Sequence, residues 1–525
     1  MQDLLDSVNF FAWALPALLV VPLVGALLIR LFGRTALPDR EPGFAPWREV
    51  RNLALGTLVV ELLIALLLWF GFDPAGPAYQ AVADYPWIPD WGARLRVGVD
   101  GISLAMVMLT AIVMPAAVLG GWTSVTTKIR SYYALLLVLT TGLMGVFLSL
   151  DLLLFYVMWE LMLVPLYFLI GIWGAAKRVR ASLKYFLFTF PVSLLMLVAI
   201  IVTYVAAGSQ SFDVEYLTAN TDMTVVGQIW LFGAFFLAFA VKSAIVPLHT
   251  WLPDAQHEAP IAAAIALGIK VGAYGLLRFA LPLFPAGAME PTVRLVIVVM
   301  AVVAIVYGAL VAMVQPDLKR LTSYSSISHV GFVFLGVFAL TVTSVEGSVL
   351  TMVSSGLATC ALFLLLGMLH ERRGTGMIAN FGGLAKVVPM YATLFTLFVL
   401  SSIGLPGTVG FVGEFLVLVG SYGTYPLATV IGATGVVLAA AYALWAFQRV
   451  FFEPLANPEN ANLSDLNRRE LGVVGVLAIL IIWLGVAPGP MLRRIEPAAQ
   501  RMVQGVSAAA GAAEAVQMRR GAEAP

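Results

Sequence analysis

Charged residues are scarce in this chain of 525 residues. Lys, Arg, Asp and Glu make up 11% of it, whereas a soluble chain of this length carries about a quarter. Hydrophobic residues make up 61%. So little polar surface cannot cover a water-facing globule, which excludes large soluble domains and indicates a membrane protein. The net charge of +1 also excludes the basic surface that is typical of nucleic-acid binding.

Cysteine is nearly absent, and the common cofactor-binding motifs are missing. The single cysteine, Cys360, has no partner in the chain for a disulfide. No CxxC or HExxH spacing is present for a cluster or zinc, and there is no Walker loop, catalytic triad or Rossmann fingerprint. We therefore expect this chain itself to bind no redox cofactor and no metal.

Long apolar runs dominate instead, each about as long as the 20 residues that cross a bilayer core. We count about fourteen and predict an all-α polytopic membrane protein. The first span covers 10–32, and the others begin near Asn52, Ile102, Tyr132, Leu152, Lys184, Val225, Pro260, Val293, Ser326, Gly347, Val388, Pro426 and Leu471.

The connections between spans are mostly short. Only 35–51, 73–101, 207–223 and 454–469 are long enough to hold a surface helix or a disordered piece. The tail from Pro488 is rich in Ala, Glu and Arg after Pro497. We expect this tail to be poorly ordered.

Lys and Arg are distributed unevenly among the predicted loops. Nineteen of them follow odd-numbered spans, and only Arg94, Arg96 and Arg294 follow even-numbered ones. The positive-inside rule places the first set in the cytoplasm and both termini outside. The five arginines of the tail oppose this orientation, but long terminal segments translocate largely regardless of charge.

Four charged residues lie deep inside predicted spans. Lys242 and Lys270 are flanked by apolar residues, and Glu160 and Glu414 are acids in similar surroundings. A charge at mid-bilayer costs at least about 2.5 to 3.5 kcal/mol on insertion scales and is by default a functional residue. The alternative is that opposite charges only hold helices together, a role that Ser or Thr fills at lower cost.

Two further charged residues in spans are less informative. Arg278 lies near the end of a span, where its side chain can reach the interface. Glu61, in the second span, has no obvious partner. For Glu61, function, helix pairing and a lateral protein contact remain open.

Two spans contain built-in breaks. Pro247 follows Lys242 by five residues, and Pro406 with Gly407 precedes Glu414; both prolines remove a backbone donor. Broken helices at membrane depth indicate ion sites in transporters built from inverted repeats. These are the seventh and twelfth spans, so spans four to eight match nine to thirteen in opposite orientation. We predict segments 1–130, 131–285 and 286–452, then a cytoplasmic loop, the fourteenth span and a tail in 453–525.

The four histidines differ in how strongly their positions indicate a role in proton transfer. His329 begins a span beside a cluster of Ser and Tyr, so proton relay and a structural role are equally open. His249 follows the broken seventh span and is a candidate for proton uptake, although a surface histidine is the default interpretation. His257 and His370 are predicted at interfaces and are given no role.

Several of these segments together resemble the antiporter-like subunits of respiratory complex I. They are LFYVMWELMLVPLYFLIGIWG around Glu160, FAVKSAIVPLHTWLPDAQHEAP around Lys242, KVGAYGLLRFALPLFP from Lys270, DLKRLTSYSSISHVGFV around His329 and GLPGTVGFVGEF at Glu414. Within that family an acid at Glu414, where sister subunits have lysine, and the lack of a long lateral C-terminal helix resemble the M-type subunits of bacteria.

The resemblance implies a fourteen-helix channel in the bacterial inner membrane. Protons would pass from Lys242, tuned by Glu160, through Lys270 and a hydrated His329 to Glu414. FMN, iron–sulfur clusters and quinone would belong to partner subunits, with antiporter-like neighbours on both sides.

Two departures from the family pattern qualify this expectation. Ser355 stands where many relatives have a second relay histidine, so water would have to complete the relay there. The segment between Asp254 and Lys270 is about one helical turn shorter than usual. The alternatives are a subunit of a multi-subunit sodium/proton antiporter or, from another class, a monomeric solute carrier.

Overall fold

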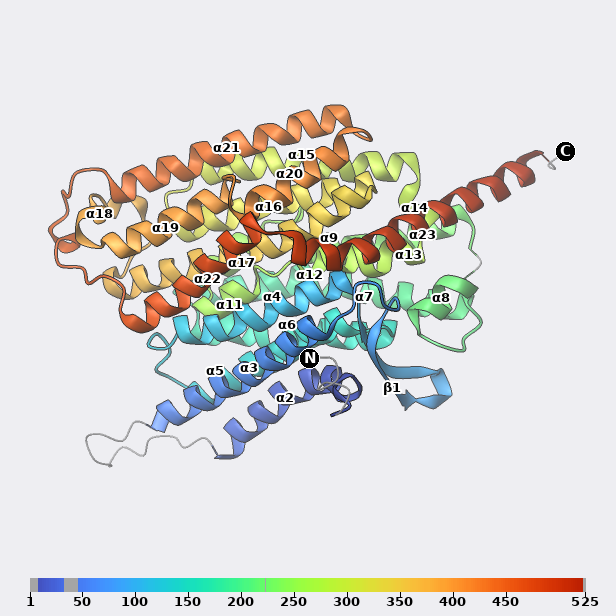
Figure 1. Ribbon diagram of the computed structural model, residues 1–525, viewed down its shortest axis with the longest axis horizontal. Coiled ribbons are helices and arrows are strands. Elements are labelled where there is room, and N and C mark those ends of the chain that lie inside the picture. The colour runs from blue at the N-terminus through green and yellow to red at the C-terminus, as the bar shows by residue number, and fades with distance from the viewer. Residues whose placement is uncertain (1–7, 33–45, 222, 523–525) are drawn as a thin grey trace.

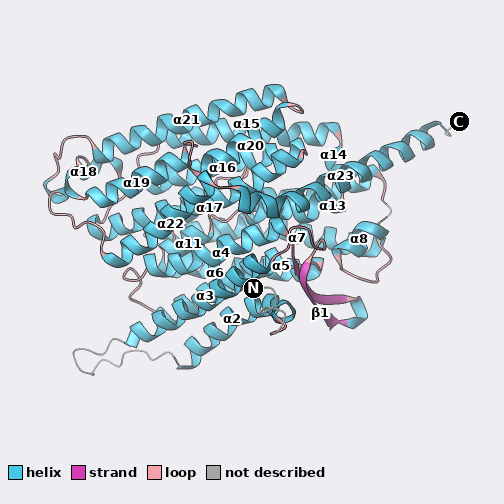
Figure 2. Ribbon diagram, viewed as in Figure 1, coloured by secondary structure: helices cyan, strands magenta, loops and turns pink. Residues whose placement is uncertain are grey.

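The computed structural model describes residues 8–32, 46–221 and 223–522. Figures 1 and 2 show an assembly of long, roughly aligned helices with a β-hairpin at one end. In the described part of the chain, thirteen helical segments are long and apolar enough to cross a membrane. They are α2 (Phe10–Phe32), α3 (Pro46–Gly71), α4 (Gly101–Gly120), α5 (Ile129–Leu148), α6 (Leu152–Trp173), α7 (Arg178–Ala206), α9 (Val225–Ser243), the segment Ile261–Leu283, α15 (Pro291–Met313), α16 (Leu318–Ala339), α17 (Val342–Arg373), α21 (Pro426–Phe451) and α22 (Arg468–Val486).

A broken helix supplies the twelfth span. Two shorter apolar helices, α19 (Pro389–Ser402) and α20 (Val409–Tyr422), are joined by the non-helical residues 403–408. Gly404 and Gly407 in this joint have φ of 75° and 90°, which glycine adopts without steric cost. The break predicted at Pro406 and Gly407 is therefore present, and with this broken helix the described residues contain fourteen spans.

The seventh span is also broken, as predicted, but the break begins earlier. Helix α9 ends at Ser243, the residues up to Thr250 are not α-helical, and α10 (Trp251–Glu258) follows. Ala244, three residues before Pro247, already has a left-handed φ of 57°. Lys242 therefore lies in the last turn of α9.

The eighth span contains a break that was not predicted. It consists of α11 (Ile261–Ala266), a non-helical stretch to Lys270, α12 (Val271–Gly275), a π-helical turn η2 (Leu276–Ala280) and α13 (Leu281–Leu283). The sequence here predicts one continuous helix, because the apolar run is long and Gly268 is the only residue in it that indicates a break. The break places Lys270 at the start of α12.

One face of the molecule, which we call the hairpin face, carries β1 (Gln80–Ile88) and β2 (Ala93–Val99), together with α8 (Val214–Asn220) and α14 (Pro285–Met289). The antiparallel strands turn at Gly92, whose φ is 64°. The prediction of a surface helix or disordered piece at 73–101 is therefore wrong, whereas the surface helix allowed at 207–223 is confirmed as α8. The hairpin itself contains η1 (Pro89–Trp91). The opposite face carries η3 (Ile378–Asn380), α18 (Leu384–Val387) and η4 (Pro458–Asn460).

The C-terminal tail is a helix, and the prediction of a poorly ordered end is wrong. Helix α23 (Gly489–Ala522) runs along the hairpin face and packs against α4, α14 and α17. Its buried residues recur at helical spacing: Met491, Ile495, Ala498, Ala499, Val506 and Ala510. This apolar stripe anchors the helix although its composition is Ala-rich and polar.

The core consists of helices that other helices surround. All of the apolar window of α17 is buried, and α4, α16 and the segment Ile261–Leu283 are nearly so. The outer helices α7, α9 and α21 have only a third of theirs buried. Polar side chains on the inner helices are therefore shielded from lipid, which lowers the free-energy cost of placing them at membrane depth.

Candidate functional site

His329 and Glu414 form a direct contact inside the membrane region. Nδ1 of His329 lies 2.7 Å from Oε1 of Glu414, and both residues are buried. His329 lies halfway along α16 rather than at the start of a span, because α16 begins at Leu318, two turns before the predicted start. Glu414 lies in the second turn of α20, just after the break. An acid and an imidazole at this distance form a hydrogen bond, along which a proton can pass.

Lys270 reaches the same helix from the break in the eighth span. Its Nζ donates to the hydroxyl oxygen of Ser326, and its exposed fraction is only 3%. Ser326 and His329 are three residues apart on α16 and so lie on one face. Ser325 completes the group: its Oγ lies 3.4 Å from Nε2 of His329 and accepts a 2.6 Å hydrogen bond from Tyr442.

A small polar cavity adjoins the contact between His329 and Glu414. Its volume of about 10 Å³ is close to the space that one water needs. Ser355 lines it, and the buried hydroxyl of Ser401 has no hydrogen-bond partner among the described residues. The other lining residues are largely polar as well: Thr322, Ser325, Ser354, Ala358, Thr359, Leu362, Ser402 and Gly410.

Lys242 is held by aromatic rings rather than by a carboxylate. Its Nζ lies 5.1 Å from the ring centre of Trp159 and donates a long 3.4 Å hydrogen bond to the hydroxyl of Tyr185. Glu160, one residue after Trp159, is half-buried and is not in ion-pair contact with Lys242. Its Oε1 is buried without a hydrogen-bond partner in the described structure. Glu160 therefore acts on Lys242 only at longer range.

The two lysines are linked by a close helix contact. Helix α12, which Lys270 precedes, packs against the end of α9, which carries Lys242. A Cβ on Gly272 would lie 2.4 Å from the hydroxyl of Ser243, so only glycine permits this approach. The Ser243 hydroxyl is buried and has no hydrogen-bond partner among the described residues.

His249 is buried, and its interpretation as a surface histidine is wrong. Its exposed fraction is 4%, and its ring lies edge-on to Tyr307 at 5.3 Å. Its Nδ1 has no partner in the described part of the chain. The break that contains Pro247 folds this residue inward, which the loop-like local sequence did not indicate.

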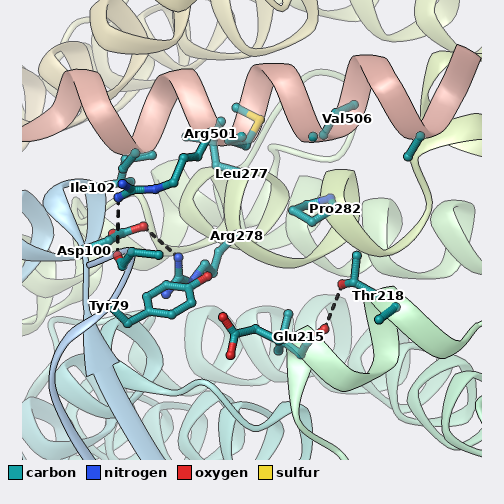
Figure 3. A pocket seen from close by; sticks show the side chains of 17 residues that line it. Tyr79, Asp100, Ile102, Glu215, Thr218, Leu277, Arg278, Pro282, Arg501 and Val506 are labelled. Atoms are coloured by element: carbon teal, nitrogen blue, oxygen red, sulfur yellow. Dashed lines mark hydrogen bonds and ion pairs between the residues drawn. The ribbon is translucent and has the colours of Figure 1, made fainter. Parts of the chain in front are cut away.

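Arg278 is paired rather than free at the interface. It donates a 2.7 Å hydrogen bond to Asp100 and stacks on the ring of Tyr79, whose centre is 4.4 Å away. Figure 3 shows this pair in a cavity of about 400 Å³ between the hairpin, α8 and α23. Arg501 and Glu215 lie on opposite walls of that cavity.

Glu61 is fully buried, and neither carboxylate oxygen has a hydrogen-bond partner among the described residues. It lies on α3, apart from the groups above. Within the described residues, no cluster of three or more His, Cys, Asp or Glu could hold a metal ion.

The structure thus joins Lys270, His329 and Glu414 through α16 and places Lys242 on the neighbouring helix. Sequence reasoning missed Ser243, Ser326, Tyr185 and Tyr442 as members of the site. The run of Ser and Tyr before His329 was the available signal for Ser325 and Ser326. Tyr185 and Tyr442 carry no local signal, because each lies in an ordinary apolar span.

Comparisons with known proteins identify the family of this chain. A family model described as NADH:quinone oxidoreductase/Mrp antiporter, transmembrane, matches residues 149–439. NADH-quinone oxidoreductase subunit M of Rhodobacter capsulatus is 40% identical over 97% of this chain and 98% of its own length. NADH-ubiquinone oxidoreductase chain 4 of Chondrus crispus is 36% identical over 93% of this chain and 97% of its own length.

Solved structures give the same result. A chain of respiratory complex I from Thermus thermophilus superposes with a TM-score of 0.84 and 32% identity, covering 94% of this chain and 99% of that one. A chain of the Mrp complex from Dietzia shares the fold, with a TM-score of 0.78 at 21% identity, covering 92% of this chain and 52% of that one. The chain belongs to the family of antiporter-like membrane subunits of NADH:quinone oxidoreductase, in its subunit M branch.

Proposed function

We propose that this chain carries protons through the membrane arm of a bacterial NADH:quinone oxidoreductase along the groups Glu160, Lys242, Lys270, His329 and Glu414. The observation that carries the proposal is the 2.7 Å contact between His329 and Glu414, one helical turn from the serine that holds Lys270. A buried base in contact with a buried acid, next to a buried amine, is a proton relay rather than a packing device.

The relay works by changes in local charge. Lys242 is half-buried, and the faces of Trp159 and Tyr185 stabilise its ammonium form. When the field of Glu160 is weakened by events outside this chain, the proton moves across the contact at Ser243 to Lys270. It then passes to His329 and Glu414.

The polar cavity beside His329 supplies what the missing histidine supplies in relatives. A hydroxyl cannot hold an extra proton at neutral pH, but Ser355, Ser401 and a water between them can pass one on. His249, buried beside Tyr307, is a secondary relay group on the Lys242 side.

The redox chemistry belongs to partner subunits. We assign FMN, iron–sulfur clusters and quinone to them, and antiporter-like neighbours to both sides of this chain. The 40% identity to a subunit M relative over nearly the whole chain favours this assembly over a sodium/proton antiporter. We place the chain in the inner membrane with both termini outside, on the charge distribution of its loops.

Replacement of Glu414 tests the proposal. In proteoliposomes that contain the assembled complex, Glu414→Gln should lower NADH-driven pumping about tenfold or more, because an amide cannot take up a proton. Glu414→Lys should retain a measurable part of it, since an amine exchanges protons.

The matched control is Glu453→Gln, which makes the same change at an exposed residue that only pairs with Arg449. It should pump like the parent. Parental pumping by Glu414→Gln, at equal levels of assembled complex, would leave Glu414 as a structural acid and overturn the proposal.

A further inference from the structure

The cavity between the hairpin, α8 and α23 has the size of a ligand-binding site (Figure 3). Its volume of about 400 Å³ falls in the range of about 300 to 1,000 Å³ that is typical of such sites. Asp100, the N-cap of α4, and Pro282, near the end of the eighth span, both line it. Because one span begins here and another ends, the cavity lies at the edge of the membrane-crossing region, at the level of lipid headgroups.

One wall of this cavity is a largely apolar face of α23. The residues of α23 that line the cavity recur at helical spacing: Ala498, Arg501, Met502, Gly505, Val506 and Ala509. Arg501 is the only charged residue among them. A Cβ on Gly505 would meet no atom within 4 Å, so the helix presents open space to the cavity at this position. A hydrocarbon chain laid along this face would be removed from water, which is favourable.

Opposite walls of the cavity carry opposite charge. Arg501 is exposed, and among the described residues its only hydrogen bond is a long one of 3.4 Å to the carbonyl of Ala78. Across the cavity, Glu215 shares the guanidinium of Arg96 with Asp213. Two carboxylates and one guanidinium leave that wall with a net negative charge. A ligand with one anionic and one cationic group is therefore complementary to the two walls.

Arg278 adds a second cation near Arg501. Its guanidinium stacks on Tyr79, and Arg501 bonds to the residue before that tyrosine, so both cations lie at the start of the hairpin. Nη1 of Arg278 donates to Asp100, which neutralises one of the two charges. The side chain of Arg278 is only 10% exposed, and its buried Nη2 has no hydrogen-bond partner among the described residues. A buried donor without an acceptor costs free energy, and phosphate oxygens are acceptors that suit a guanidinium group.

We infer that this cavity binds a zwitterionic phospholipid whose headgroup carries a primary amine, as in phosphatidylethanolamine. Arg501 and Arg278 receive the phosphate, Glu215 receives the ammonium group, and the apolar face of α23 receives the beginning of an acyl chain. An anionic lipid such as phosphatidylglycerol brings no cation to Glu215, and a soluble phosphoester leaves the apolar face uncovered. The inference concerns binding alone, so it is independent of the proton path proposed above.

Photo-crosslinking of the assembled complex in nanodiscs tests the choice of headgroup. The probes are phosphatidylethanolamine and phosphatidylglycerol with the same diazirine in one acyl chain, and mass spectrometry locates their adducts. In the parent, phosphatidylethanolamine should label α23 several-fold more than phosphatidylglycerol does. Glu215→Gln should abolish this preference, whereas Arg501→Gln should reduce labelling by both lipids, because both carry a phosphate. Equal labelling of the parent by the two lipids would overturn the inference.

A filled cavity gives an independent test that leaves every charge in place. Gly505→Leu extends a side chain into the cavity from a position with no atom near the new Cβ, so labelling by phosphatidylethanolamine should fall several-fold. Gly511→Leu is the matched control, because it makes the same change on the same helix, also with open space around the Cβ, outside the cavity. It should be labelled like the parent. Equal labelling of the two variants would place the lipid elsewhere and refute the site.

Competition distinguishes a lipid from a soluble phosphoester. Unlabelled phosphatidylethanolamine in the disc should reduce labelling of α23 in proportion to its share of the lipid. Millimolar glycerophosphoethanolamine, which has the same headgroup but no acyl chain, should leave labelling unchanged. Displacement of the probe by this soluble compound would show that the cavity takes a phosphoester without a hydrocarbon chain, and would overturn the inference.

Discussion

At the scale of single residues, the proposed function requires Glu160 to act on Lys242 without touching it. A cation over an aromatic face gains about 0.5 to 2 kcal/mol, whereas dehydration of a buried ion costs several kcal/mol. The rings of Trp159 and Tyr185 therefore offset only part of that cost. In the proposed function, the charge of Glu160 supplies the remaining stabilisation of the ammonium form of Lys242.

Substitution of Glu160 should reveal this longer-range control. Glu160→Gln keeps the volume and removes the charge, so NADH-driven acidification of inverted membrane vesicles should fall about tenfold while assembly stays intact. Glu160→Asp should retain more activity, because the charge survives. Normal acidification by Glu160→Gln would show that Lys242 needs no acidic partner.

The charged members of the site were predictable because each interrupts an apolar run. The contact between His329 and Glu414 was not, since 85 residues separate them and no local pattern relates their helices. The burial of His249 was not predicted for a similar reason. Its neighbouring residues are typical of a surface loop, and only the fold of the break places the histidine in the interior.

At the scale of elements, the joint of the twelfth span positions Glu414. Gly404 has a left-handed φ of 75°, and a Cβ there would lie 3.3 Å from Oε2 of Glu414. Gly404→Ala should therefore cost about 1 to 2 kcal/mol of stability and lower pumping several-fold by displacing the carboxylate from His329. Gly472→Ala, in α22 with open space around the new methyl group, is the control and should leave pumping unchanged. Unaltered pumping by Gly404→Ala would mean that the joint does not set the position of Glu414.

The cap of α6 should make stability depend on pH. Asp151 accepts hydrogen bonds from the backbone N–H groups of Leu153, Leu154 and Arg94. Burial nevertheless raises its pKa from 3.8 to about 6. A raised pKa contributes stability that is complete below the unfolded value and is lost as the pH rises through about 6.

Asp151→Asn removes this titration. Between pH 5 and pH 8 the apparent Tm of the parent should fall relative to that of the variant, by the equivalent of about 1 kcal/mol or more. Thermal unfolding of the purified complex at several pH values, followed by intrinsic fluorescence, measures the difference. A difference that stays constant with pH would show that Asp151 titrates alike in the folded and unfolded chain.

Spans were predictable element by element, since hydrophobic length alone identifies them. The hairpin was not, because its strands alternate only weakly between apolar and polar residues. The break in the eighth span lacks a proline, and the apolar stripe of α23 was hidden in an Ala-rich sequence. In all three cases tertiary packing decides the structure.

At the scale of the whole molecule, orientation in the membrane is the main prediction that remains open. The exposed residues Thr127 and Ala176 lie on the face opposite the hairpin, and the exposed Thr218 lies on α8 of the hairpin face. Cysteines at the first two positions should react only with a membrane-impermeant thiol reagent added to the cytoplasmic side, and a cysteine at Thr218 only with reagent added outside. The reverse pattern would invert the assignment of both termini.

The inverted relation between spans four to eight and nine to thirteen, with segments 131–285 and 286–452, also stays a prediction. The breaks in the seventh and twelfth spans are compatible with it. This prediction was made from Pro247, Pro406 and Gly407 alone, and the break in the eighth span is not part of its basis.

The complete burial of α17 separates the inner helices from the bilayer as a solvent. With 32 residues, α17 is about 48 Å long, well beyond a hydrocarbon core of about 30 Å. Because its apolar window contacts only protein, no hydrophobic mismatch acts on it, and lipids of different acyl length press on the outer helices instead. The inner helices therefore keep the same protein surroundings in lipids of different thickness, whereas the outer helices, including α9 with Lys242, adapt to the membrane.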